Sequence, residues 1–192
     1  MARPRKFDET HVLTAAMETF WRRGYEATST RDLSDSTGLG QSSLYNTFGD
    51  KRELYLRALR HYYDTHTAEQ TALLDRPGPV KERLRDLMVH AVDTDLADSG
   101  ASGCFSINAS VEKADSDDEV REEVRRHFTT VERALTQTIA RGQRSGEIAA
   151  QRNAGALARR ILTTYYGLRV LARVQKDRDA LLDIVESTVS AL

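Results

Sequence analysis

The chain has 192 residues, a formal net charge of −1, 40% hydrophobic residues and 30% charged residues, as in globular proteins rather than disordered ones. This length can form a core without a metal or disulfide staple, and a single cysteine excludes an internal disulfide and a Cys-rich zinc site. No apolar run approaches the roughly 20 residues of a membrane span, and no apolar stretch follows the basic start. We therefore expect a soluble, cytoplasmic protein that does not bind membranes.

The first 74 residues predict four helices. An apolar stripe from Val12 to Trp21 has helical spacing and ends at Gly24. Ser29 and Asp32 form a capping pattern for a short second helix that ends at Gly38. A third short helix covers residues 41–48, and a long fourth helix runs from residue 51 to about residue 74.

The second half predicts about five more helices. Two prolines and a glycine in residues 75–79 break the chain before a helix over residues 80–97. A short apolar segment follows at residues 104–111, then a long helix over residues 120–139, preceded by an acidic turn and ended by the segment 142–146. Asn153 caps a helix that reaches residue 172, and the last helix follows the connection 177–179. The expected fold class is all-α, with about nine helices.

The segment from residue 28 to residue 54 has the pattern of a helix-turn-helix, because two short helices flank a tight glycine-containing turn. The second of these helices carries short polar side chains suited to base edges in a major groove, with Tyr45 and Lys51 placed for phosphate contact. The alternative is a polar surface without function. The candidate DNA-binding residues are Thr30, Arg31, Gln41, Ser42, Ser43, Tyr45, Asn46, Thr47 and Lys51.

Specific motifs run from Phe20-Trp21-Arg22-Arg23-Gly24-Tyr25 through Thr37-Gly38-Leu39 and Ser43-Leu44-Tyr45-Asn46-Thr47-Phe48 to Asp50-Lys51. This stretch, over residues 7–60, closely resembles the DNA-binding domain of tetracycline-repressor-type (TetR family) regulators. The resemblance implies a homodimeric, all-helical, non-enzymatic repressor with a variable ligand-binding C-terminal domain. It divides the chain into a DNA-binding domain at residues 1–50 and a ligand-binding and dimerisation domain at residues 51–192.

Arg3, Arg5 and Lys6 form a basic arm within residues 1–6. Such an arm can neutralise DNA phosphates even on a slightly acidic protein; the alternative is a solvated tail. The five histidines and the acidic turn at residues 115–119 lack metal-ligand spacing, so we predict no metal, no cofactor and no catalytic residue.

Apolar residues of the middle helices predict either an adaptable ligand pocket or an ordinary core. The pocket interpretation includes Asn108 as a polar anchor and predicts an unknown small-molecule effector. Its candidate residues are Met88, Val92, Cys104, Phe105, Asn108, Phe128 and Val131. Cys104 itself is either a small buried hydrophobic residue or, beginning a helix after Gly103, a sensor of oxidants or electrophiles.

The last two helices are candidates for dimerisation, because each carries more apolar surface than one core contact uses. A palindromic double-stranded DNA operator requires two recognition helices related by a two-fold axis. The candidate interface residues are Tyr165, Leu168, Arg169, Ala172, Ile184 and Val185. The alternative is that both stripes face their own domain.

The sequence thus predicts a DNA-binding repressor released by a small molecule. An activator, or a repressor that responds to oxidants or electrophiles through Cys104, is the alternative within this class. A helical enzyme or carrier with a vestigial helix-turn-helix is the hypothesis from another class.

Overall fold

Six helices begin after a side chain that caps their N-terminus by accepting backbone N–H bonds. The capping residues are Asp8, Ser29, Asp50, Asp117, Asn153 and Asp177. Ser29 and Asp32 form the reciprocal capping box that the sequence predicts. Local polar chemistry therefore sets most helix starts.

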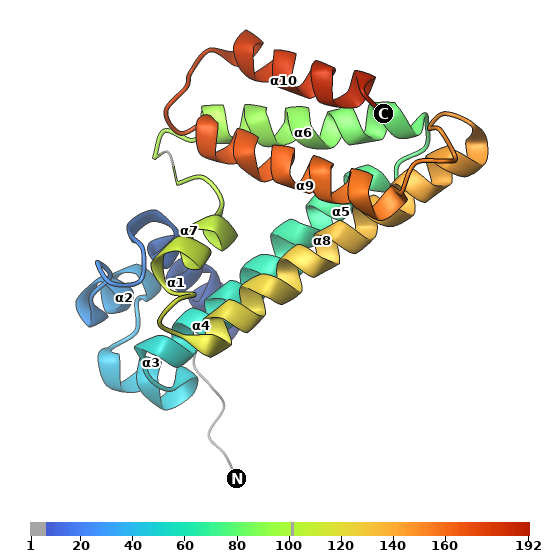
Figure 1. Ribbon diagram of the computed structural model, residues 1–192. Helices are drawn as coiled ribbons and strands as arrows, with labels where there is room; N and C mark the ends of the chain where they lie inside the picture. The colour runs from blue at the N-terminus through green and yellow to red at the C-terminus, as the bar shows by residue number, and fades with distance from the viewer. Residues whose placement is uncertain (1–6, 101) are drawn as a thin grey trace.

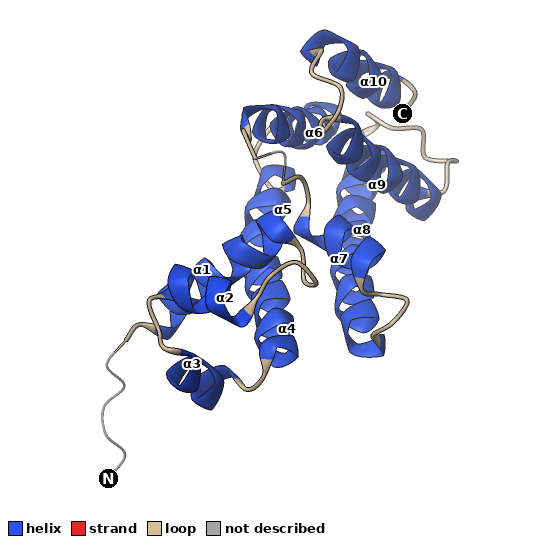
Figure 2. Ribbon diagram, turned by 90° about the vertical axis from the view of Figure 1, so that its left-hand side faces the viewer, coloured by secondary structure: helices blue, strands red, loops and turns tan. Residues whose placement is uncertain are grey.

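The computed structural model describes residues 7–100 and 102–192; the predicted basic arm, Arg3, Arg5 and Lys6, lies outside them. The described residues are all-helical, which confirms the predicted fold class (Figures 1 and 2). The elements are α1 (Glu9–Arg23), α2 (Thr30–Thr37), α3 (Gln41–Phe48), α4 (Lys51–Tyr62), a π-helical segment η1 (Tyr63–Thr67), α5 (Ala68–Leu74), α6 (Val80–Ala97), α7 (Phe105–Glu112), α8 (Asp118–Ser145), α9 (Ala154–Leu171) and α10 (Arg178–Ser190). Because α4, η1 and α5 are continuous, the described residues form nine helical rods, as expected.

The rod α4–η1–α5 lies beside α8, and the two run in the same direction (Figure 1). Arg52 of α4 binds Asp117 at the start of α8, and Asp75 after α5 binds Arg141 near its end. This pair of rods joins the α1–α3 region to the layer of α6, α9 and α10. Two parallel rods therefore link the α1–α3 region directly to the helices α6, α9 and α10.

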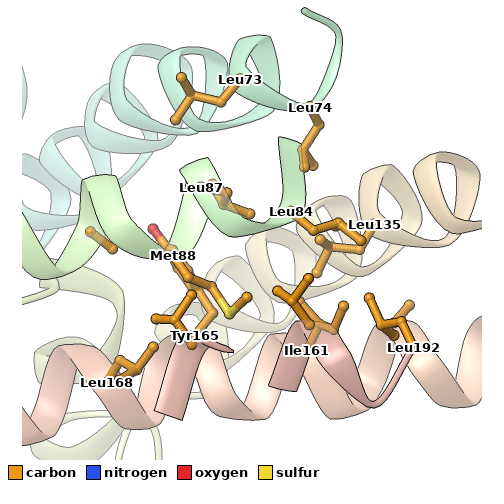
Figure 3. Close-up of a cluster of buried hydrophobic side chains, with 14 of the residues drawn as sticks. Leu73, Leu74, Leu84, Leu87, Met88, Leu135, Ile161, Tyr165, Leu168 and Leu192 are labelled. Carbon is orange, nitrogen blue, oxygen red and sulfur yellow. The ribbon is translucent and has the colours of Figure 1, made fainter. Parts of the chain in front are cut away.

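One hydrophobic core lies among α5, α6, α8, α9 and α10 (Figure 3). It contains most of the side chains predicted for the dimer interface. Tyr165, Leu168, Arg169, Ala172 and Val185 are all at most 5% exposed, and Ile184 is partly buried against the same core. The five buried residues are core of this chain, because α9 uses this face to cover α6 and α8 and α10 uses its own to cover α6. The partly exposed Ile184 stays a candidate for the interface.

A second core joins α1–α4 to α7 and the first turns of α8. Phe20, Leu33, Leu44 and Leu54 are fully buried in it, together with Phe105 of α7. The N-terminal helices therefore share one apolar core with a segment from the middle of the chain. No helix among the described residues is both long and apolar enough to cross a bilayer.

Candidate DNA-binding interface

The helices α2 and α3 meet through a tight turn in which Gly38 adopts φ +69°, a left-handed conformation that glycine tolerates best. Leu44 and Phe48 hold the inner face of α3 in the core. Gln41, Ser42, Ser43 and Asn46 are exposed on the outer face. The short polar helix therefore presents side chains that can reach base edges in a groove about 12 Å wide.

The first turns of α2 and α3 are joined by a hydrogen bond. The Gln41 side-chain amide donates to the Thr30 hydroxyl oxygen at 3.0 Å. Thr47 donates its hydroxyl proton to the Ser43 carbonyl within α3. Arg31 is exposed, 3.8 Å from Asp35 one turn along α2. Thr30 and Gln41 are thus in direct contact across the turn, and the Arg31 guanidinium is accessible to an anion.

Tyr45, Thr47 and Lys51 are half-buried, whereas the other six candidates are exposed. Burial raises the pKa of Tyr45, and its hydroxyl has no hydrogen-bond partner among the described residues. The Lys51 ammonium lies over the Tyr25 ring, 4.4 Å from its centroid, at the start of α4. All nine predicted DNA-binding residues lie on α2, α3 or the first residue of α4.

Residues 12–58 match "Bacterial regulatory proteins, tetR family", and residues 80–187 match "Tetracyclin repressor-like, C-terminal domain". The chain belongs to the TetR family. Along its full length it is 34% identical to the HTH-type transcriptional regulator YezE of Bacillus subtilis, covering 100% of both chains. It is 29% identical to the transcriptional repressor ComR of Escherichia coli, over 97% of this chain and 90% of that one.

A solved structure with the same fold is a cysteine mutant of the TetR family regulator CifR in complex with 26-base-pair operator DNA. It aligns with a TM-score of 0.87 and 31% identity, covering 98% of this chain and 99% of that one. The present protein is accordingly a DNA-binding transcriptional regulator of the TetR family.

In this TetR-family regulator, acidic residues at the start of α8 hold basic residues of α4. Arg52 donates two hydrogen bonds to Asp117, at 2.6 and 2.8 Å, and these lower the pKa of Asp117 to about 2. Arg60 binds the buried Glu123 at 2.7 Å. The first turns of α8 are thereby fixed to α4, the helix that follows α3.

Seven side chains predicted to line one effector pocket are divided by the structure. Met88, Val92 and Val131 belong to the core of α6, α8 and α9, whereas Phe105 and Phe128 pack in the core of the N-terminal helices. Asn108 lines a cleft of about 420 Å³ between α1, α7 and α9. The seven residues therefore do not line one common cavity among the described residues, although the Phe128 ring contacts Tyr166, which packs against the other core.

Cys104 is the N-cap residue of α7 and is 3% exposed. Its sulfur lies 3.7 Å from the Tyr62 hydroxyl. The carbonyl of the preceding residue, Gly103, accepts hydrogen bonds from the Trp21 indole at 3.0 Å and from Arg169 at 3.3 Å. The thiol therefore sits at a point where α1, α4 and α9 meet.

His127 is buried between η1 and α9, where both ring nitrogens have partners. One lies 3.0 Å from the Thr67 hydroxyl and the other 3.0 Å from the Tyr166 hydroxyl. Burial lowers the pKa of His127 to about 4, with a smaller contribution from the Arg169 charge. The imidazole is neutral at pH 7 and joins α8 to its two neighbours.

Sequence patterns did not reveal the role of Glu112. Its carboxylate accepts hydrogen bonds from the backbone N–H groups of Tyr25 and Glu26, both at 2.8 Å. These partners are more than 80 residues away in the sequence. They are backbone groups, which every residue type except proline carries, so only the tertiary structure identifies them.

Proposed function

We propose that this regulator is a repressor that binds a palindromic operator as a homodimer and is released by a small-molecule effector. The observation that carries the proposal is the exposed polar face of α3 on a short helix whose other face is buried. Support comes from the relative ComR, which is described as a repressor, and from CifR, which was solved with operator DNA.

In this proposal Gln41, Ser42, Ser43 and Asn46 read base edges. Thr30, Arg31 and Lys51 hold the sugar–phosphate backbone and set the register of the protein on the duplex. Thr47 lies on α3 with the base-reading side chains, and the buried Tyr45 hydroxyl is assigned no phosphate. The Thr30 hydroxyl and the Lys51 ammonium lie at helix N-termini, where the free backbone N–H groups also favour phosphate.

The dimer of this proposal uses the exposed side of α9. Val170 and Leu171 are 49% and 43% exposed, and Val174, just beyond the helix, is 82% exposed. A Cβ atom added at Gly167 would meet nothing within 4 Å, which leaves room for a partner helix to approach closely. Burial of this apolar strip by a second copy would remove it from water.

The proposed effector site is the cleft beside Asn108. Its volume of about 420 Å³ is typical of small-molecule sites, which often lie between domains. Its wall combines apolar Ile107, Val111 and Val170 with the cationic Arg173. A ligand there would touch both α1 and α7 and could favour one spacing of the DNA-facing segments.

A salt series with two variants tests the DNA interface. Operator duplexes would first be selected from random-sequence DNA by the parent protein. Asn46→Ala should relax base preference at one position, at a cost of about 1–3 kcal/mol, without changing the salt dependence. Arg31→Ala should weaken binding to all sequences alike and reduce the salt dependence, because Arg31 is exposed and contacts none of the base-reading side chains. Parent-like binding by both variants would contradict the proposed interface.

The repressor role is tested with a reporter gene placed behind the selected operator. Deleting the regulator should raise transcription, whereas an activator would show the reverse. A thermal-shift screen then identifies effectors as compounds that stabilise the protein and lower its operator affinity. Val111→Trp should block such compounds by filling the cleft; an unchanged response would place the effector elsewhere.

A further inference from the structure

The Tyr25 ring contacts two ammonium groups that come from distant parts of the chain. Lys51 lies 4.4 Å from the ring centroid, and Lys113, just after α7, lies 4.7 Å from it. Each contact is an attraction between a cation and the ring's negative face. A single aromatic side chain thereby links the start of α4 to the end of α7.

The backbone at Tyr25 is held by the same segment of α7. Glu112 accepts the N–H groups of Tyr25 and Glu26, and Lys113 forms a 3.1 Å ion pair with Glu26. Two successive N–H groups that converge on one carboxylate form an anion-binding nest. A Cβ atom at Gly24, which has φ +80°, would lie 2.9 Å from a Glu112 carboxylate oxygen, so this approach requires glycine.

The other end of α7 is tied to the same aromatic cluster. Phe105 makes edge contacts with Tyr55 and Tyr62 of α4, and Tyr55 in turn contacts the Tyr25 ring at 5.0 Å. The end of α7 therefore contacts Tyr25 directly, and its start contacts Tyr55, which packs against the Tyr25 ring. A displacement of α7 cannot leave this ring in place without breaking one of these contacts.

We propose that Tyr25 is a positioning residue for DNA binding, through which α7 sets the location of the Lys51 ammonium. Glu112 and Lys113 hold Tyr25, and the ring holds Lys51 ready for a phosphate. The loss of side-chain freedom is then incurred during folding rather than on binding DNA. This inference rests on the proposed function only in taking Lys51 as a phosphate contact.

The test measures operator affinity of the full-length chain across a salt series, by fluorescence anisotropy with the duplex selected by the parent. The logarithm of the binding constant falls linearly with the logarithm of salt concentration, and each lost phosphate contact reduces the magnitude of this slope by about 0.9. Lys51→Ala should therefore reduce the slope by about 0.9 per protomer. Tyr25→Leu should reduce it equally, the double variant no further, and Tyr25→Phe, which keeps the ring, should behave as the parent.

Glu112→Ala provides a second route that leaves the aromatic core intact, and it should also lower the slope. Glu122→Ala is its matched control, because Glu122 lies on the exposed surface of α8 and pairs only with Arg125 among the contacts described. The inference is overturned if Lys51→Ala lowers the slope while Tyr25→Leu and Glu112→Ala retain the parent's. An unchanged slope in Lys51→Ala would instead contradict the DNA interface of the proposed function.

Discussion

The guanidinium of Arg169 on α9 makes two parallel hydrogen bonds to the Asp95 carboxylate on α6, each 2.8 Å long. Both side chains are at most 5% exposed. Arg169 also donates to the Gly103 carbonyl, which in turn accepts from Trp21 of α1. A buried ion pair between α6 and α9 is thus connected to the first helix.

Breaking this pair should be strongly destabilising, because the remaining charge would be buried without a partner. Asp95→Ala should lower the free energy of unfolding by about 3–5 kcal/mol. Replacing both residues, with Asp95→Leu and Arg169→Met, should restore much of the loss since no charge then remains. Urea denaturation measures both effects; a cost below about 1 kcal/mol for Asp95→Ala would contradict the expectation.

His127 should make stability fall in mild acid. Its pKa in the folded chain is about 4, below the usual value of 6.5, so the unfolded chain binds more protons between these two pH values. Stability is therefore fully present above about pH 6.5 and decreases as the pH falls toward 4, by up to about 3 kcal/mol.

Denaturation curves at a series of pH values measure this dependence. Burial also lowers the pKa of His66, which acts in the same direction, so the parent alone cannot isolate His127. The variant His127→Gln, which keeps polar atoms near Thr67 and Tyr166, should have the flatter curve. Superimposable pH profiles for parent and variant would show that His127 is not responsible.

Gly24→Ala should reduce stability by about 1–3 kcal/mol, because φ +80° with ψ 170° is a conformation available almost only to glycine. The added methyl group would also collide with the Glu112 carboxylate. Gly146→Ala is the control: Gly146 has φ +82° and ψ 3° but no atom near its Cβ position, so its cost should be the smaller, about 1–2 kcal/mol. In thermal melts, a cost at Gly24 no greater than that at Gly146 would contradict both the backbone strain and the Glu112 contact.

Cys104 should be slow to react with mild oxidants, since its thiol is 3% exposed and lies against Tyr62. We expect hydrogen peroxide to leave the operator affinity of the parent and of Cys104→Ser equally unchanged. Anisotropy measurements before and after treatment, with mass spectrometry of the thiol, check this. Loss of binding in the parent alone would favour a redox sensor at Cys104.

Charging the exposed strip of α9 should separate the proposed dimer. The double variant Val170→Lys and Val174→Lys should sediment as a monomer at micromolar concentration while keeping the parent's helical content. Arg121→Glu is the control, because Arg121 is exposed on α8, away from the strip. A monomeric parent, or a dimeric double variant, would rule out this interface.

Local rules allowed the sequence to predict much of the fold. Ser29, Asp50 and Asn153 cap helices where the pattern places them, and the boundaries of the helix at residues 80–97 are confirmed. Capping depends on residues within three positions of one another, so it can be recognised without knowledge of the fold. The same holds for the short polar helix α3 between its glycine-containing turns.

The tertiary structure decided which neighbour covers each apolar face. The stripe through Tyr165 and Leu168 shows that α9 has a buried side, but helical periodicity does not state whether its own chain or a second copy buries it. The same limit applies to Glu112, whose partners are backbone amides, and to His127, whose pKa depends on the groups packed around it. These properties come from long-range contacts, whereas helix starts and turns come from local ones.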